Sequence, residues 1–133
     1  MNISSVILEV SILDRSVDFY SRVLGMTETV REGNVTLLKS AEGSQIYLRS
    51  SKATVHPTSG LGLRAVAWTA DSADDFKAVE QRLRALGAHR DTVNHEGFTV
   101  IEGVDPDGLV LVVVYPGPDD MARHSILTAV AAW

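Results

Sequence analysis

The hydrophobic pattern of the chain occurs twice, in the same order, in its two halves. The first half opens with an apolar strand at Ser5–Ile12 and a helix at Asp14–Leu24, and three short strand-like runs follow. The second half has a strand at Leu63–Thr69 and a helix at Ser72–Leu86, with further strands that end at Leu109–Tyr115. Two copies predict an α+β fold of two βαβββ modules, because a solenoid needs three or more repeats to bury its core.

The ends of the second predicted helix carry recognisable signals. Ser72 followed by Asp75 is typical of an N-cap with a supporting carboxylate, and Gly87 suits the left-handed residue that follows a helix. Gly25 closes the first helix in the same way. The second helix also has an apolar stripe at helical spacing, which predicts a buried face; its members are Phe76, Val79, Leu83 and Leu86.

Composition along the chain divides it into four parts. Residues 51–62 are rich in Ser, Thr, Gly and Pro and have no periodicity, so they are predicted to link a first module at 1–50 to a second at 63–116. Residues 117–133 form a C-terminal tail, in which a short helix is expected from Asp119 onward. This tail is expected to pack on a partner subunit or over the cleft.

Charge and composition exclude several classes of protein. The 133 residues carry a formal charge of −5, and their 12 basic residues are scattered, which argues against nucleic-acid binding. Without cysteine there is no disulfide, thiolate nucleophile or Cys-ligated metal. No segment approaches the ~20 apolar residues of a membrane span, and the N-terminus lacks signal-peptide features. We therefore expect a cytoplasmic protein that binds no membrane.

Two motifs resemble one known family. They are the stretch Arg15–Met26, which includes Phe19-Tyr20 and ends in Leu24-Gly25-Met26, and Asp105-Pro106-Asp107-Gly108 before the final strand. Together they resemble the vicinal oxygen chelate superfamily of glyoxalase I, extradiol dioxygenases, fosfomycin-resistance enzymes and bleomycin-resistance proteins. The resemblance reaches to about Tyr115. It implies that the two modules form a curved mixed-sheet cleft and that the protein is a homodimer with two clefts at the subunit interface.

The metal-dependent members of this superfamily carry His, Glu, His or Gln, and Glu on the first, fourth, fifth and eighth strands. Aligning the shared motifs puts these positions at Ser5, Tyr47, Ala65 and Val112, none of which is a usual ligand of a divalent cation. The resemblance, with these departures, predicts no metal and no other cofactor. The four histidines show no ligand spacing and are expected to be exposed or locally bonded; they are His56, His89, His95 and His124.

Strand parity, started from those four positions, predicts the lining of the cleft, because alternate residues of a strand face the same side. The lining has an apolar half and a half with a carboxylate, a guanidinium and a phenol, which suits an organic ligand with a flat apolar body. The intervening residues, such as Leu8, Trp68 and Leu111, are expected to pack under the helices. The predicted lining residues are Ser5, Ile7, Glu9, Gln45, Tyr47, Arg49, Leu63, Ala65, Ala67, Val110, Val112 and Val114.

Two functions fit this lining. The first is a metal-independent binder that sequesters an apolar or aromatic natural product or antibiotic, as the resemblance to bleomycin-resistance proteins implies. The second is a metal-independent isomerase, cyclase or lyase of secondary metabolism, with Glu9 as general base and Tyr47 or Arg49 stabilising an oxyanion. A structural ion pair between Glu9 and Arg49 is an equal alternative for these two residues. The binder is favoured because no second titratable group is clearly placed to work with Glu9. A catalytically inactive paralogue is a third possibility.

Overall fold

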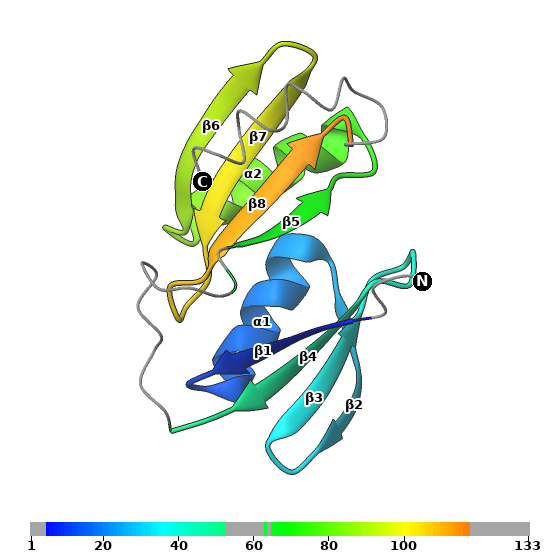
Figure 1. Cartoon of the computed structure of the whole chain (residues 1–133), viewed down its shortest axis with the longest axis vertical. Helices are drawn as coiled ribbons and strands as arrows, with labels where there is room; N and C mark the ends of the chain where they lie inside the picture. Colours follow the sequence, from blue (N-terminus) through cyan, green and yellow to red (C-terminus); the bar gives the residue numbers. More distant parts are fainter. Residues whose placement is uncertain (1–4, 53–62, 64, 118–133) are drawn as a thin grey trace. The chain divides into compact units, whose positions relative to one another are not determined.

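The fold consists of two compact units, Met1–His56 and Pro57–Trp133. A computed structural model of the chain describes residues 5–52, 63 and 65–117 (Figure 1). The first unit contains β1 (Val6–Val10), α1 (Leu13–Leu24), β2 (Thr27–Glu32), β3 (Val35–Lys39) and β4 (Gln45–Ser50). The second contains β5 (Ala65–Thr69), α2 (Ala73–Ala85), β6 (His89–His95), β7 (Phe98–Val104) and β8 (Val110–Tyr115).

The predicted α+β fold of two βαβββ modules is confirmed. Each unit holds one four-stranded mixed sheet, with the order β1-β4-β3-β2 in the first unit and β5-β8-β7-β6 in the second. In both sheets the first and last strands of the module pair in parallel, and the other neighbours are antiparallel. The tail helix predicted from residue 119 lies outside the described residues, and so does most of the predicted linker.

In the first unit the core lies between α1 and one face of the sheet. Leu8 on β1 and Leu48 on β4 are buried there, and α1 contributes Phe19 and Tyr20, whose rings meet edge to face at 5.2 Å. The helix ends where predicted, at Gly25, which adopts φ 66°. Residues with a side chain rarely take this left-handed conformation, so glycine is the natural terminator here.

The second unit repeats this arrangement around α2. The Ser72 hydroxyl accepts a hydrogen bond from the Asp75 N–H at 3.1 Å, and the Asp75 carboxylate accepts one from the Asp71 N–H at 3.3 Å. These bonds satisfy two free donors at the start of the helix, as the N-cap prediction requires. The buried face of α2, which includes Leu83, covers the sheet face that carries Ile101 on β7. The prediction that Leu86 belongs to this buried face is wrong: α2 ends at Ala85, and Leu86, its C-cap, is 37% exposed. At 12 and 13 residues, α1 and α2 are both too short to span a bilayer, and the described chain has no membrane-spanning helix.

Gly103 marks the closest approach of α2 to its sheet. A Cβ atom at this residue would lie 3.0 Å from Cδ2 of Leu83 and 3.1 Å from the carbonyl oxygen of Ala88. That carbonyl accepts a hydrogen bond from the Val104 N–H at 2.9 Å, so its position is set by the sheet. Only glycine leaves room for the helix at this distance.

We therefore expect Gly103→Ala to lower the free energy of unfolding by about 1–3 kcal/mol, through overpacking. Urea denaturation measures this loss. In a matched double variant with Leu83→Val, which removes a carbon beside the added methyl group, the loss should be smaller than the sum of the two single losses. Strictly additive losses would contradict the close contact.

Candidate functional site

The face of the first sheet that α1 does not cover brings together the polar and apolar side chains predicted from that unit. We call it the helix-free face of the first sheet. In the register of β1 and β4, Ile7 lies beside Tyr47 and Glu9 beside Arg49. Ser5 lies one residue before β1 and is partly buried. The face comprises Ile7, Glu9, Thr27, Val30, Glu32, Val35, Leu37, Lys39, Gln45, Tyr47 and Arg49.

Glu9 and Arg49 form the ion pair that the sequence allowed as one alternative. The Arg49 guanidinium donates through Nη2 to Oε1 of Glu9, across the neighbouring strands β1 and β4. Both side chains remain accessible, with 39% of Glu9 and 53% of Arg49 exposed. A pair this open to water contributes at most about 1 kcal/mol to stability, so both charges are available to a ligand.

An apolar strip crosses the middle of the same face. Ile7 is 67% exposed and Val30 is 61% exposed, whereas Leu37 and Tyr47 are half-buried between them.

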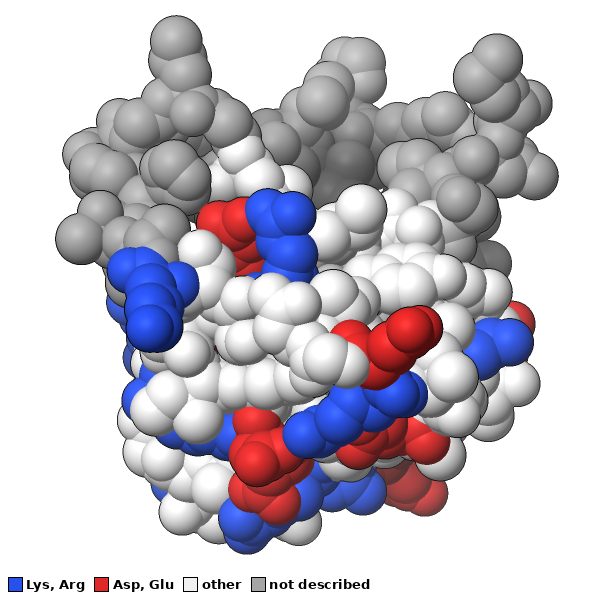
Figure 2. Space-filling model, turned by 90° about the horizontal axis from the view of Figure 1, so that it is seen from below, with Lys and Arg blue, Asp and Glu red and all other residues white. Residues whose placement is uncertain are grey.

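Figure 2 shows one face of the molecule, where acidic and basic side chains lie next to one another with uncharged surface between them. The described part of that face has no broad patch of one charge.

The helix-free face of the second sheet is different, because its central strands are closed to solvent. Val110 and Val112 on β8 are 3% and 0% exposed and pack in one cluster with Phe98, Val100 and Val114. Ala65 packs against this cluster, and Ala67, which pairs with Val112, is exposed. Among the residues predicted to line a site, those of the first sheet are therefore the more accessible.

The prediction of the lining used strand parity on only four strands, so it missed the residues that β3 and β7 contribute to the helix-free faces. Leu37 and Lys39 of β3 share the helix-free face with Tyr47 and Gln45, their register partners on β4. On β7, Glu102 lies beside Val112, and its carboxylate is 3.7 Å from the Arg90 guanidinium. The alternation of faces along β3 would have identified Leu37 and Lys39 as members of this face only if the register of the β3–β4 hairpin had been known.

The four positions aligned with the superfamily's metal ligands are equivalent in the two sheets. Extending the Val6–Ile46 pairing by one residue puts Ser5 beside the residue two positions before Tyr47 on β4. In the second sheet, Ala65 likewise pairs with the residue two positions before Val112 on β8. These side chains offer a hydroxyl, a phenol, a methyl group and an isopropyl group. None is an imidazole, thiolate or carboxylate, so they do not fit a divalent metal. In the described residues no group of three or more His, Cys, Asp or Glu side chains could hold a metal ion.

The two described histidines are locally engaged, as the sequence predicts. Nε2 of His89 lies 2.8 Å from the Thr92 hydroxyl. His95 stacks on Phe98 across the β6–β7 hairpin, with ring centroids 4.6 Å apart and an interplanar angle of 15°. His56 and His124 lie outside the described residues.

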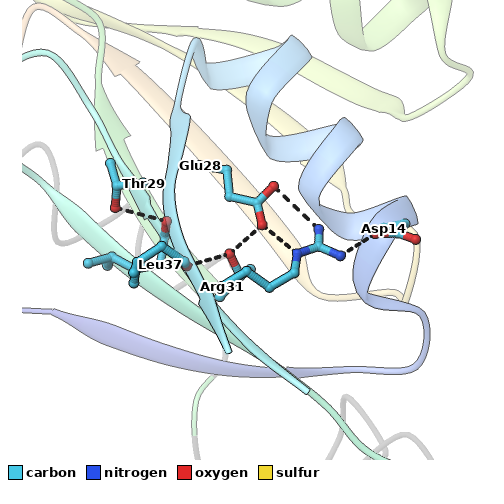
Figure 3. A network of polar contacts seen from close by, with 7 residues as sticks. Asp14, Glu28, Thr29, Arg31 and Leu37 are labelled. Atoms are coloured by element: carbon cyan, nitrogen blue, oxygen red, sulfur yellow. Dashed lines mark hydrogen bonds and ion pairs between the residues drawn. The ribbon is translucent and has the colours of Figure 1, made fainter. Parts of the chain in front are cut away.

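A polar network fastens the start of α1 to the edge strand β2 (Figure 3). Arg31 donates to Asp14 and to Glu28, in both cases at 2.5 Å, and the buried Thr36 hydroxyl donates to Glu28 at 2.8 Å. The bonds from Arg31 and then Thr36 hold the pKa of Glu28 below its usual value. The same carboxylates raise the pKa of Arg31. The network keeps β2 aligned with the rest of the sheet.

A second network joins α2 to the edge strand β6. Glu80 accepts hydrogen bonds from the Thr92 hydroxyl at 2.7 Å and from Arg84 at 2.8 Å, and Nε2 of His89 lies 3.6 Å away. The Thr92 bond, followed by the Arg84 bond, lowers the pKa of Glu80. Each unit therefore ties its helix to its edge strand through a carboxylate.

Comparison with known proteins places this fold in a family. The profile of the Glyoxalase/Bleomycin resistance protein/Dioxygenase superfamily matches residues 2–113. The chain belongs to this superfamily. A search of curated proteins found no significant match.

Solved structures of superfamily proteins share the fold at low sequence identity. A glyoxylase/bleomycin resistance protein/dioxygenase domain from Frankia sp. EAN1pec is 22% identical with a TM-score of 0.77, covering 89% of this chain and 96% of that chain. Oxidase ChaP-H2 is 16% identical with a TM-score of 0.71, covering 88% and 94%. A possible glyoxalase from Bacillus cereus is 19% identical with a TM-score of 0.69, covering 85% and 97%. At these identities the likeness establishes the fold alone.

The Glu80 network predicts a pH dependence of stability. Because the pKa of folded Glu80 lies below the ordinary value of 4.5, its ionised form stabilises the fold above that pH, and the contribution disappears as pH falls through the lowered value. We expect Glu80→Gln to cost about 1 kcal/mol at pH 7 and progressively less below pH ~4.5. Urea denaturation from pH 7 to 3 measures the difference. Glu96→Gln, in an exposed turn, serves as control, and a pH-independent cost at residue 80 would contradict the assignment.

Proposed function

We propose that this protein is a metal-independent small-molecule-binding protein of the bleomycin-resistance type. It sequesters an apolar or aromatic natural product or antibiotic, and it does so as a homodimer in the cytoplasm. The observation that carries the proposal is the helix-free face of the first sheet. There an accessible apolar strip lies beside hydrogen-bonding side chains, at strand positions where the superfamily's metal ligands are replaced by Ser5 and Tyr47.

The composition of this face suits binding without chemistry. Removing a large apolar side chain such as Ile7 from water contributes up to about 1.5–3 kcal/mol. The Tyr47 ring offers a flat surface on which an aromatic ligand can stack. Gln45 and the Glu9–Arg49 pair supply donors and acceptors at either end of the apolar strip. Affinity and orientation can both come from these groups.

The alternative function, a metal-independent isomerase, cyclase or lyase, requires Glu9 to act as a general base. Its Oε1 atom already accepts from the Arg49 guanidinium. A carboxylate has two oxygens and accepts several hydrogen bonds, so this bond does not prevent Glu9 from accepting a proton from a substrate. Tyr47 is another titratable side chain near Glu9. It lies on β4, two residues before the register partner of Glu9. Sequestration makes no such demand on Glu9.

Metal content tests the first half of the proposal. After dialysis against a chelator and incubation with Zn²⁺, Mn²⁺ or Ni²⁺, the desalted protein should retain well under one metal ion per chain in elemental analysis. The reason is that serine, phenol and aliphatic side chains cannot replace imidazole and carboxylate ligands. A stoichiometric divalent metal would overturn metal independence.

Native mass spectrometry tests the second half. The untagged protein, incubated with an extract of its source organism, should be a dimer that retains a small molecule, and the molecule released from it should be chromatographically unchanged. Glu9→Gln should keep most of this capture, whereas Tyr47→Ala should weaken it about tenfold through loss of an aromatic contact worth ~1.4 kcal/mol. A released molecule of altered mass or retention time, formed by the wild type and not by Glu9→Gln, would establish the enzyme instead.

A further inference from the structure

Lys39 differs from the other two lysines of the chain. Lys52 and Lys77 are exposed, but Lys39, the last residue of β3, is partly buried. Among the described residues no carboxylate lies within ion-pair distance of its ammonium group. A partly buried lysine lays its apolar stem along the sheet and holds its strongly hydrated ammonium group at the surface. Within residues 5–52, 63 and 65–117 this cation has no acidic partner, so it is available to a group that these residues do not supply.

The strand register places Lys39 at one end of the helix-free face of the first sheet. It lies beside Gln45 on β4 and Thr27 on β2. The next residues on the same face, two positions along each strand, are Leu37 and Tyr47, which begin the apolar strip. At about 3.3 Å per residue, the strip is centred roughly 7 Å from Lys39 and the far end of the face roughly 13 Å away.

The far end of the face carries a cation whose charge is offset by neighbouring carboxylates. Arg49 lies there, but its guanidinium is paired with Glu9. Glu32 shares that end, because its register partner Val35 lies beside Arg49. Two carboxylates therefore accompany one guanidinium at that end. At the other end the strands carry one ammonium group and the amide of Gln45, and the exposed Glu42 lies in the β3–β4 turn, beyond ion-pair distance of Lys39. The face is polarised along the strands, with its positive end at Lys39.

We propose that this face selects a flat apolar molecule that carries an anionic group. The anion, a carboxylate or sulfonate, binds Lys39 and Gln45, and the apolar body lies over Leu37, Tyr47 and Ile7. This inference rests on the proposed function and adds the charge of the ligand to it. Because the whole chain has a formal charge of −5 and repels anions in general, the preference depends on this local cation.

A matched pair of fluorescent probes tests the inference. 8-Anilinonaphthalene-1-sulfonate and N-phenyl-1-naphthylamine share the same aromatic body, and only the first carries an anion. Titration of the full chain at low salt should give a Kd for the sulfonate about fivefold below that of the neutral probe, as expected for one partly exposed ion pair. Raising NaCl from 20 to 500 mM should weaken binding of the sulfonate alone.

Charge variants locate the effect. Lys39→Met keeps an apolar side chain of similar length and should remove the preference for the sulfonate without changing the affinity for the neutral probe. Lys39→Arg should retain the preference, and Lys77→Met, on the exposed part of α2, should leave both affinities unchanged. Thermal unfolding checks that each variant is folded. If Lys39→Met does not fold, Lys39→Gln and the salt dependence of the wild type replace it.

The outcomes separate this inference from the proposed function. Equal wild-type affinities for the two probes, both weakened by Tyr47→Ala, would leave the binding face in place and overturn its preference for anions. A preference that survives in Lys39→Met, or is lost equally in Lys77→Met, would also overturn the role of Lys39. If neither probe binds, or if Tyr47→Ala weakens neither, the face does not bind aromatic molecules, and the proposed function fails together with the inference.

Discussion

The parallel pairing of the first and last strands in each unit is the constraint on which the rest of the structure depends. Two parallel neighbours cannot be joined by a tight turn and need a long crossover connection. In the first unit that connection contains α1 and the hairpin strands β2 and β3, and in the second it contains α2, β6 and β7. The single helix covers one face of its sheet. Among the residues that the structure describes, no helix covers the opposite face, and on the first sheet the candidate site lies there.

Each helix is held to its sheet in two different ways. Apolar packing fixes it over the central strands, where a Cβ atom added at Gly103 would lie 3.0 Å from Leu83 of α2. Polar networks fix it to the edge strand, through Arg31 in the first unit and Glu80 in the second. Edge strands have fewer apolar partners than central strands, so charged hydrogen bonds carry the alignment there.

The two units share a fold but not a surface chemistry. At corresponding places, the first sheet carries Glu9, Tyr47 and Arg49. The second carries Thr69, Val112 and Val114, and the two valines belong to a buried apolar cluster. A sheet needs only apolar residues on its helix-covered side to be stable, so the other side is free to diverge between the copies. In this chain the last strand of the first module carries Tyr47 and Arg49 on that side, whereas the last strand of the second carries only buried valines there.

Periodicity and capping residues in the sequence were enough to determine the order of the elements, the ends of both helices and the residues that face each helix. These features are local, because they depend on spacings of two to four residues and on single residues such as Ser72 and Gly25. The same parity placed Glu9 and Arg49 together, and alignment on the shared motifs predicted that the superfamily's metal-ligand positions hold Ser5, Tyr47, Ala65 and Val112.

Only the tertiary structure decided which of these side chains remain accessible and which partners they meet. The network of Asp14, Glu28 and Arg31 joins a helix to a strand, and no periodic pattern encodes the distance between them. The closure of Val112 and the partial burial of Lys39 likewise depend on what packs around a strand, and strand parity assigns a face without telling whether that face is covered. Local structure follows from neighbouring residues in the chain, but burial and pairing follow from the register of strands that are distant in sequence.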